Sequence, residues 1–280
     1  MRRPAILCGI RVAIVLAGLL WAGLAAAQTP SPFNYWQNAA GIVLAPLGGP
    51  IPEWRASVGI GVAALPRYEG SNQYRAVPAP SFDIRYKDIA FASSGDGVGV
   101  NILHGQTYRA GIAVGYDLGR DEDLSGRLRG IGNVEAAPEL RLFAEGVVLP
   151  FVLTADLRRA LGGHEGLIGD LGAYVPVVGR EDLIVFVGPS ATFADDRYMQ
   201  AYFGISTAQA EASAEHFPIY RAEAGFKNFG IGAAAIYYIT DQWFLDGDLS
   251  FERLVDSAGN SPIVQNRNQF AAAVVVGYQF

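Results

Sequence analysis

The chain ends in the sequence FAAAVVVGYQF, residues 270–280, and this stretch decides the fold. Every second position of it, from Phe270 to Phe280, is apolar. Alternation of this kind is the two-residue period of a β-strand that has one apolar face. The stretch closes on two aromatic residues at alternate positions, Tyr278 and Phe280, which we interpret as a signal for barrel assembly.

The same period recurs along the chain, for example from Trp54 to Val62, from Tyr108 to Leu118 and from Trp243 to Phe251. These segments predict about twelve strands of roughly ten residues, an even number as expected for a membrane barrel. The expected strands are residues 54–64, 75–86, 88–103, 107–118, 135–145, 147–158, 167–179, 182–194, 219–227, 229–240, 243–255 and 267–280. A break at residues 95–97 would divide the third strand. With these boundaries the long connections do not all fall on one side of the sheet.

The residues on the polar face of these strands distinguish two all-β architectures. In a soluble sandwich the polar face meets water, whereas in a membrane barrel it fills the lumen and the apolar face meets lipid. Here the polar face carries glycine and charge, and aromatic residues stand at strand ends, so we predict a closed antiparallel transmembrane β-barrel. The charges expected in the lumen are Arg55, Arg85, Arg109, Arg141, Asp156, Arg158, Asp246 and Asp248, with Arg221 and Glu223 on the strand expected at 219–227.

Composition agrees with this prediction and excludes other classes. The 280 residues are 51% hydrophobic and 17% charged, which is too apolar for a disordered chain. A net charge of -6 disfavours a nucleic-acid partner, because the chain would repel phosphate.

The N-terminal region divides into two expected segments before the barrel of residues 54–280. Residues 1–27 have the basic start, the apolar stretch and the small-residue site of a secretory signal peptide. A membrane anchor is the alternative. Residues 28–53 contain five prolines, at positions 30, 32, 46, 50 and 52, and predict an extended periplasmic segment or a partial plug of the lumen.

No catalytic or metal-binding pattern is recognisable in the sequence. The three histidines, His104, His164 and His216, stand in or beside expected turns, where we interpret each as a solvated loop residue. Residues 195–204 predict a short helix that packs its aromatic residues on the barrel rim. We therefore expect no enzyme, no cofactor and no bound metal.

Several short segments resemble the MipA/OmpV family of Gram-negative outer-membrane proteins, in order over residues 54–280. They are PRYEGS (66–71), GYDLGR (115–120), LRGIGN (128–133), DRYMQAYFG (196–204), SPI (261–263) and the terminal YQF. The residues that carry the resemblance are Tyr68, Gly70, Ser71, Gly119, Arg120, Gly130, Gly132, Glu139, Arg197, Tyr198, Tyr202, Phe203, Gly204, Ser261 and Pro262. We refer to them as the motif residues.

The resemblance implies an outer-membrane barrel that acts as a non-enzymatic scaffold. The family takes its name from a member that joins a lytic transglycosylase to a murein synthase in the periplasm. Two alternatives stay open from the residues themselves. The mixed charges of the lumen could line a narrow channel for ions or small solutes, and the surface loops could form an adhesin.

Overall fold

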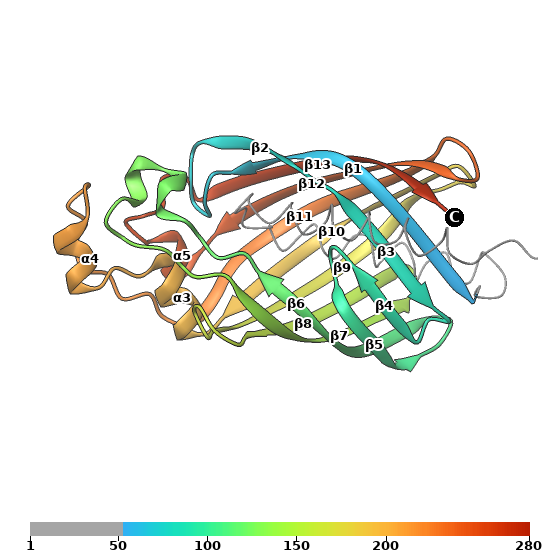
Figure 1. Ribbon diagram of the computed structural model, residues 1–280, viewed down its shortest axis with the longest axis horizontal. Helices are drawn as coiled ribbons and strands as arrows, with labels where there is room; N and C mark the ends of the chain where they lie inside the picture. The colour runs from blue at the N-terminus through green and yellow to red at the C-terminus, as the bar shows by residue number, and fades with distance from the viewer. Residues whose placement is uncertain (1–52) are drawn as a thin grey trace, which may run out of the picture.

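The computed structural model describes residues 53–280, and these form one antiparallel sheet that closes on itself (Figure 1). The signal peptide expected at residues 1–27, and nearly all of the proline-rich segment at 28–53, lie outside the described residues. The strands are β1 (Trp54–Pro66), β2 (Tyr74–Pro78), β3 (Ser81–Tyr86), β4 (Ala90–Ser93), β5 (Gly97–His104), β6 (Tyr108–Asp117), β7 (Ala137–Val148), β8 (Phe151–Ala160), β9 (Leu167–Gly179), β10 (Leu183–Ala194), β11 (Gly225–Tyr238), β12 (Trp243–Leu254) and β13 (Asn268–Gln279).

The first and last strands close the barrel. β1 pairs with β13 from Ser57 opposite Gln279 to Ala64 opposite Ala272, and the Phe280 amide donates to the Ala56 carbonyl at 2.9 Å. β2 and β3 pair with successive lengths of the other edge of β1, so together they occupy the place of one strand. The 13-stranded sheet therefore closes as a barrel that is twelve strands around. The predicted fold class is confirmed.

Several expected strands differ from the structure, and these differences explain why the long connections could not be placed on one side. The expected strand 75–86 is interrupted between Pro78 and Ser81, and the expected strand 88–103 is divided into the hairpin of β4 and β5, close to the break considered at residues 95–97. The two strands expected at 219–227 and 229–240 are the single strand β11. A bulge opposite Thr192 and Phe193 places both Lys227 and Asn228 in the interior, and this break in the alternation imitates a turn.

With these boundaries, every long connection lies at one end of the barrel. We call that end the cap; it comprises residues 67–73, 118–136, 161–166, 195–224 and 255–267. The short β4–β5 turn, residues 94–96, points toward the same end but is not part of the cap. The opposite end, which we call the turn rim, has connections 87–89, 105–107, 149–150, 180–182 and 239–242 and also holds the start of β1 and the end of β13. Outer-membrane barrels have short periplasmic turns and longer extracellular loops, which orients the cap outward.

Helices occur only in the cap among the described residues. They are the 3₁₀ helices η2 (Glu122–Leu124) and η3 (Gly126–Leu128) and the α-helices α3 (Asp196–Phe203), α4 (Thr207–Ala212) and α5 (Asp256–Gly259). Asp195 caps the N-terminus of α3 and Gly204 follows its last residue, as the sequence predicts. None of the described helices is long and apolar enough to span a membrane.

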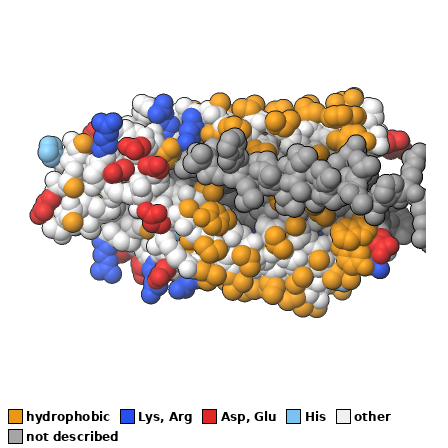
Figure 2. Space-filling model, viewed as in Figure 1, with side chains coloured by type: hydrophobic (Ala, Val, Ile, Leu, Met, Phe, Trp, Pro, Cys, Tyr) orange, Lys and Arg blue, Asp and Glu red, His pale blue; other side chains and the backbone are white. Residues whose placement is uncertain are grey.

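On the face shown in Figure 2, apolar side chains lie over the strands up to the cap, and charged side chains gather over the cap. Exposed apolar residues along the strands from β1 to β13 define this apolar belt. Belt residues such as Ile60 and Val98 are 73% and 65% exposed. The turn-rim side of the belt carries tryptophan and tyrosine, including a Trp54–Tyr86 ring pair 4.7 Å apart. An extended apolar surface of this kind is stable against lipid and unstable in water.

Candidate functional site

The middle of the lumen is filled by arginine and carboxylate side chains from strands far apart in sequence. Arg141 on β7 binds Asp96 at the tip of the β4–β5 hairpin at 2.7 Å, and its Nε donates to Asp156 on β8. Arg85 on β3 binds Asp83 and Asp96 at 2.8 and 3.0 Å. Both arginines and Asp96 are nearly inaccessible to solvent, so each charge depends on its partners.

Further pairs extend this layer around the lumen. Arg109 binds Asp88 at 2.9 Å, and Arg158 binds Asp170 at 2.7 Å. Glu139 is 4% exposed, and its one ion pair is a longer contact of 3.7 Å with Arg158. This layer of ion pairs fills the middle of the lumen with side chains, as is typical of the interior of a small barrel.

The structure places all eight predicted lumen charges on the inner face of the wall. Arg55 lies on β1, and Asp246 and Asp248 are successive inward residues of β12. Arg221 and Glu223 were predicted there wrongly, because they belong to the β10–β11 connection and are exposed. Sequence reasoning missed the buried ion pair between Lys227 and Glu69, 2.6 Å apart, because the bulge in β11 hides the inward position of the lysine.

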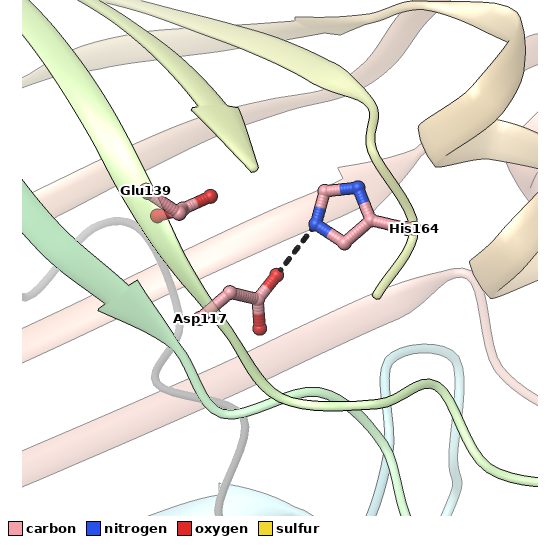
Figure 3. Close-up of side chains that lie close together, drawn as sticks. All are labelled: Asp117, Glu139 and His164. Carbon is pink, nitrogen blue, oxygen red and sulfur yellow. Dashed lines mark hydrogen bonds and ion pairs between the residues drawn. The ribbon is translucent and has the colours of Figure 1, made fainter. Parts of the chain in front are cut away.

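The cap is fastened to the barrel at Asp117, the last residue of β6. Its carboxylate accepts hydrogen bonds from the Gly119 amide at 2.7 Å, the Tyr202 hydroxyl at 2.9 Å and His164 Nε2 at 2.9 Å. Figure 3 shows His164 and Asp117 in contact, with Glu139 of β7 close by. One carboxylate thus joins three connections of the cap: 118–136, 161–166 and the segment with α3.

Asp117, Glu139 and His164 have the residue types of a metal site, but the histidine has no nitrogen lone pair left to bind a metal. One ligand atom from each of Asp117, Glu139 and His164 lies within 4.8 Å of the others. However, His164 Nδ1 accepts the Gly166 amide proton at 2.9 Å, so Nε2 carries the ring proton of the neutral imidazole and donates it to Asp117. Neither nitrogen has a free lone pair to ligate a metal or to act as a general base.

The interpretation of His164 as a solvated loop residue was therefore wrong. Its side chain is fully buried, and its ring packs against Tyr198 and Tyr202 with centroids 5.1 and 5.5 Å apart. His104 and His216 are exposed. The buried position of His164 was hidden because its partner Asp117 lies 47 residues away in sequence.

The glycines of the LRGIGN segment adopt backbone angles that other residues avoid. Gly130 and Gly132 have φ of +84° and +81°. Their amides both donate to one Glu122 oxygen, at 2.8 and 3.0 Å. The two amides can reach the Glu122 carboxylate because both residues adopt left-handed backbone angles. A residue with a Cβ is strained at these angles, and this accounts for glycine at both positions.

A second group of polar contacts ties the cap to itself. Arg120 Nη1 donates to the Tyr202 carbonyl at 2.6 Å, and Ser261 Oγ donates to the Phe203 carbonyl at 2.6 Å. The Tyr68 hydroxyl donates to the Ile263 carbonyl at 3.1 Å, across 195 positions of sequence. These bonds surround two apolar clusters that include Met199 and Phe203 in one and Leu128, Ile205 and Ile263 in the other.

Burial changes the acid–base properties of the cap. It raises the pKa of Tyr198 and Tyr202 well above the ordinary range, and raises the pKa of Tyr68 to about 12. Burial also lowers the pKa of Arg120. The three phenols are therefore neutral hydrogen-bond donors at physiological pH.

The motif residues converge on the cap and on the lumen beneath it. Besides the contacts above, Gly70 donates its amide to Gln269 at 3.0 Å, Ser71 is 1% exposed, and the Pro262 carbonyl accepts Arg127 at 2.7 Å. Arg197 also lies in the cap, but it is exposed and pairs with Glu165 at 3.0 Å. Tyr278 and Phe280 lie instead at the turn rim, where they pack on each other with ring centroids 5.1 Å apart.

A cavity of about 460 Å³ lies between the cap and the charged layer. Its inner walls include Asp117, Glu139, Arg158, Tyr198 and Tyr202. A cavity of this size is within the range that holds a small ligand, and it combines aromatic faces with charge.

Comparison with known proteins identifies relatives of the chain. The family described as "MltA-interacting protein MipA" matches residues 58–280. The outer membrane protein Omp26La of Vibrio anguillarum is 29% identical over 199 residues, which cover 68% of this chain and 69% of that protein. Outer membrane protein OmpV of Vibrio cholerae serotype O1 is 28% identical over the same shares of each chain. Among solved structures, the NanC porin matches 80% of this chain and 98% of its own at 9% identity, with a TM-score of 0.41.

Proposed function

The chain belongs to the MltA-interacting protein family and is an outer-membrane β-barrel, and from this premise we propose that it anchors periplasmic murein enzymes to the outer membrane. The family match over residues 58–280 carries the proposal. The partners proposed are a lytic transglycosylase and a murein synthase. The barrel itself would be non-enzymatic, a proposal supported by His164, whose two ring nitrogens are both engaged.

The arrangement of the barrel supports an anchor in two ways. The charged layer at mid-lumen is built from close ion pairs, which favours a rigid body over a wide pore. The turn rim faces the periplasm if the cap faces outward, and the segment that precedes Glu53 joins the barrel there. A periplasmic partner would therefore meet the short turns of this rim.

Co-isolation from the outer membrane tests the proposal. We expect the full-length protein to capture the lytic transglycosylase and the murein synthase of its own cell. Replacing residues 180–182 of the turn rim by Gly-Ser-Gly should reduce capture. The matched control replaces Glu165 and Arg197, an exposed ion pair of the cap, and should leave capture unchanged. Failure of the unmodified protein to retain either enzyme would contradict anchoring, and binding of host matrix by the cap would replace it with adhesion.

A narrow channel is the second candidate, favoured by the 460 Å³ cavity beneath the cap. Six of its charged lining residues are acidic and three are basic, which would favour cations. Single-channel recording decides between the two: steady cation-selective openings would support transport, and their absence from correctly folded protein would leave anchoring as the better account.

A further inference from the structure

The barrel wall is incomplete on one side, above the β4–β5 hairpin. The last pair between β5 and β6 is Val98 opposite Val114, so Gly115 and the two residues after it pair only with β7. On the other side of the hairpin, β2 pairs only with β1 among the described residues. Between β2 and the end of β6, no strand formed by the described residues 53–280 completes the wall. We call this opening the window.

The window borders the short strand β2, which ends at Pro78. Neither Pro78 nor Pro80, which follows the strand, has an amide proton to donate to a further strand. The hairpin tip forms the lower border, where the Ser94 amide donates to the Phe82 carbonyl at 3.0 Å. The window is thus a built feature with defined borders.

The cavity beneath the cap reaches the outer surface through the window. Its lining includes inward charges such as Glu139 and Arg158, and also outward apolar residues, Val98, Val114 and Tyr116. Those three outward side chains are 65%, 51% and 61% exposed and belong to the lipid-facing belt. Unpaired backbone at membrane depth is tolerated where it is buried in protein or lines a water-filled cavity, and the charged cavity is an environment of the second kind.

The chemistry of the cavity selects a positive charge. Its three basic residues are each engaged by carboxylates: Arg141 by Asp96 and Asp156, Arg158 by Asp170, and Lys227 by Glu69. Glu139 is 4% exposed, reaches its cation only at 3.7 Å and lines the cavity. Beside it stand Tyr198 and Tyr202, with ring centroids 4.5 Å apart. The Lys227 ammonium already lies over the Tyr198 ring, 5.5 Å from its centroid, so this wall of the cavity accommodates a cation, and the attraction for a further one comes from Glu139.

We propose that the window admits a cationic amphiphile from the lipid phase, with its head beside Glu139 and the two tyrosines and its tail across the apolar border of the window. The tail would contact Val98, Val114 and Tyr116. This binding is independent of the anchoring of murein enzymes.

Photo-crosslinking in lipid nanodiscs tests the proposal. The probe is an alkyl trimethylammonium amphiphile that carries a benzophenone in its tail, and the comparison probe is the alkyl sulfate of equal length. We expect the ammonium probe to label residues 94–98 and 114–118, and unlabelled alkyl trimethylammonium to compete for this labelling. Equal competition by the alkyl sulfate would overturn the proposed cationic preference.

Two variants distinguish labelling through the window from labelling by general contact with lipid. A Cβ on Gly115 meets nothing within 4 Å and Gly115 lines the cavity, so Gly115→Trp fills the opening without a backbone clash. We expect about 10-fold lower labelling. The matched control is Gly247→Trp on β12, also in open space but on the outward face of the complete wall, which should label like the unmodified protein.

Glu139→Gln tests the head group without changing the shape of the window. It should weaken competition by the ammonium amphiphile about 10-fold while heat-resistant folding on gels is kept. Labelling that is equal in all variants would show ordinary lipid contact and overturn the proposal. Crosslinks from a photoreactive residue at position 115 to residues 28–52, with none to the amphiphile, would assign the window to the protein's own chain and overturn it as well.

Discussion

The two ends of this barrel satisfy the polar groups of their connections in different ways. At the turn rim, short connections leave polar groups to water, and the ion pair of Arg180 with Asp182 has side chains that are 66% and 41% exposed. In the cap, long connections bury their polar groups, so Asp117 is satisfied by three donors from the protein. The difference teaches that a long loop becomes rigid when its polar groups must satisfy one another, and that each such group is then costly to remove.

The largest expected difference is between an arginine of the charged layer beneath the cap and one of the turn rim. Arg141→Met removes the closer cation of buried Asp156 and one of the two cations of buried Asp96, and should lower the free energy of unfolding by about 3–5 kcal/mol. Arg180→Met, at the turn rim, should have little effect because its ion pair is exposed. Urea unfolding in lipid vesicles, followed by tryptophan fluorescence, measures both. Equal stability of the two variants would break the comparison.

Asp117→Asn should have the next largest effect. The amide keeps the shape of the side chain but loses the charge and one acceptor oxygen, at a cost of about 1.5–3 kcal/mol. We expect faster hydrogen exchange in residues 118–136 and 161–166, with strand amides of β7 to β9 unchanged. Asp182→Asn is the control at the turn rim and should leave exchange in the cap as it is. Slow exchange in the cap of Asp117→Asn would show that the loops are held without this carboxylate.

Gly130→Ala tests the backbone of the cap. A Cβ at φ of +84° should cost about 1–2 kcal/mol and release the hydrogen bond to Glu122. Trypsin should then cleave faster after Arg129. At the turn rim, a Cβ on Gly179 meets nothing within 4 Å, so Gly179→Ala should not change the rate of digestion by trypsin. Unchanged cleavage in both variants would mean that the LRGIGN turn tolerates a side chain.

The smallest effect at neutral pH is expected for Tyr68→Phe, which loses one hydrogen bond worth about 1 kcal/mol. Its alkaline behaviour is more informative. Burial raises the pKa of Tyr68 from 10.0 to about 12, so the unfolded chain ionises first as pH rises. The stabilisation from the neutral phenol is complete below pH 10 and is lost as pH approaches 12.

The deficit of Tyr68→Phe relative to the unmodified protein should therefore shrink between pH 8 and pH 11.5. Unfolding midpoints at the two pH values measure this change. A deficit that stays constant for Tyr68→Phe would contradict the burial of its hydroxyl.

The barrel could be predicted because its signal is local. Lipid on one side and a lumen on the other impose a period of two on each strand, and Val274 and Val276 show it without knowledge of any neighbour. The predictions failed where tertiary pairing overrode the local pattern. The bulge opposite Phe193 put Lys227 and Asn228 on the same side, and this made one strand resemble two.

The site beneath the cap was predicted only in part. The inward positions of Arg141 and Asp156 follow from alternation, but the identity of their partner Asp96 does not, because it stands in a turn 45 residues from Arg141. His164 gives no local signal of burial, since its partner is equally distant. Long-range pairs of this kind depend on which strands become neighbours, and alternation does not encode that.

By itself, the sequence determined that this chain is a membrane barrel with charged lumen residues and the motifs of its family. The reason is that strand alternation and short motifs are properties of neighbouring residues. Only the tertiary structure decided that all long connections share one end, that Asp117 fastens three of them, and that the wall stops between β2 and β6. These features arise from strand register and closure, which are set by contacts across the whole barrel.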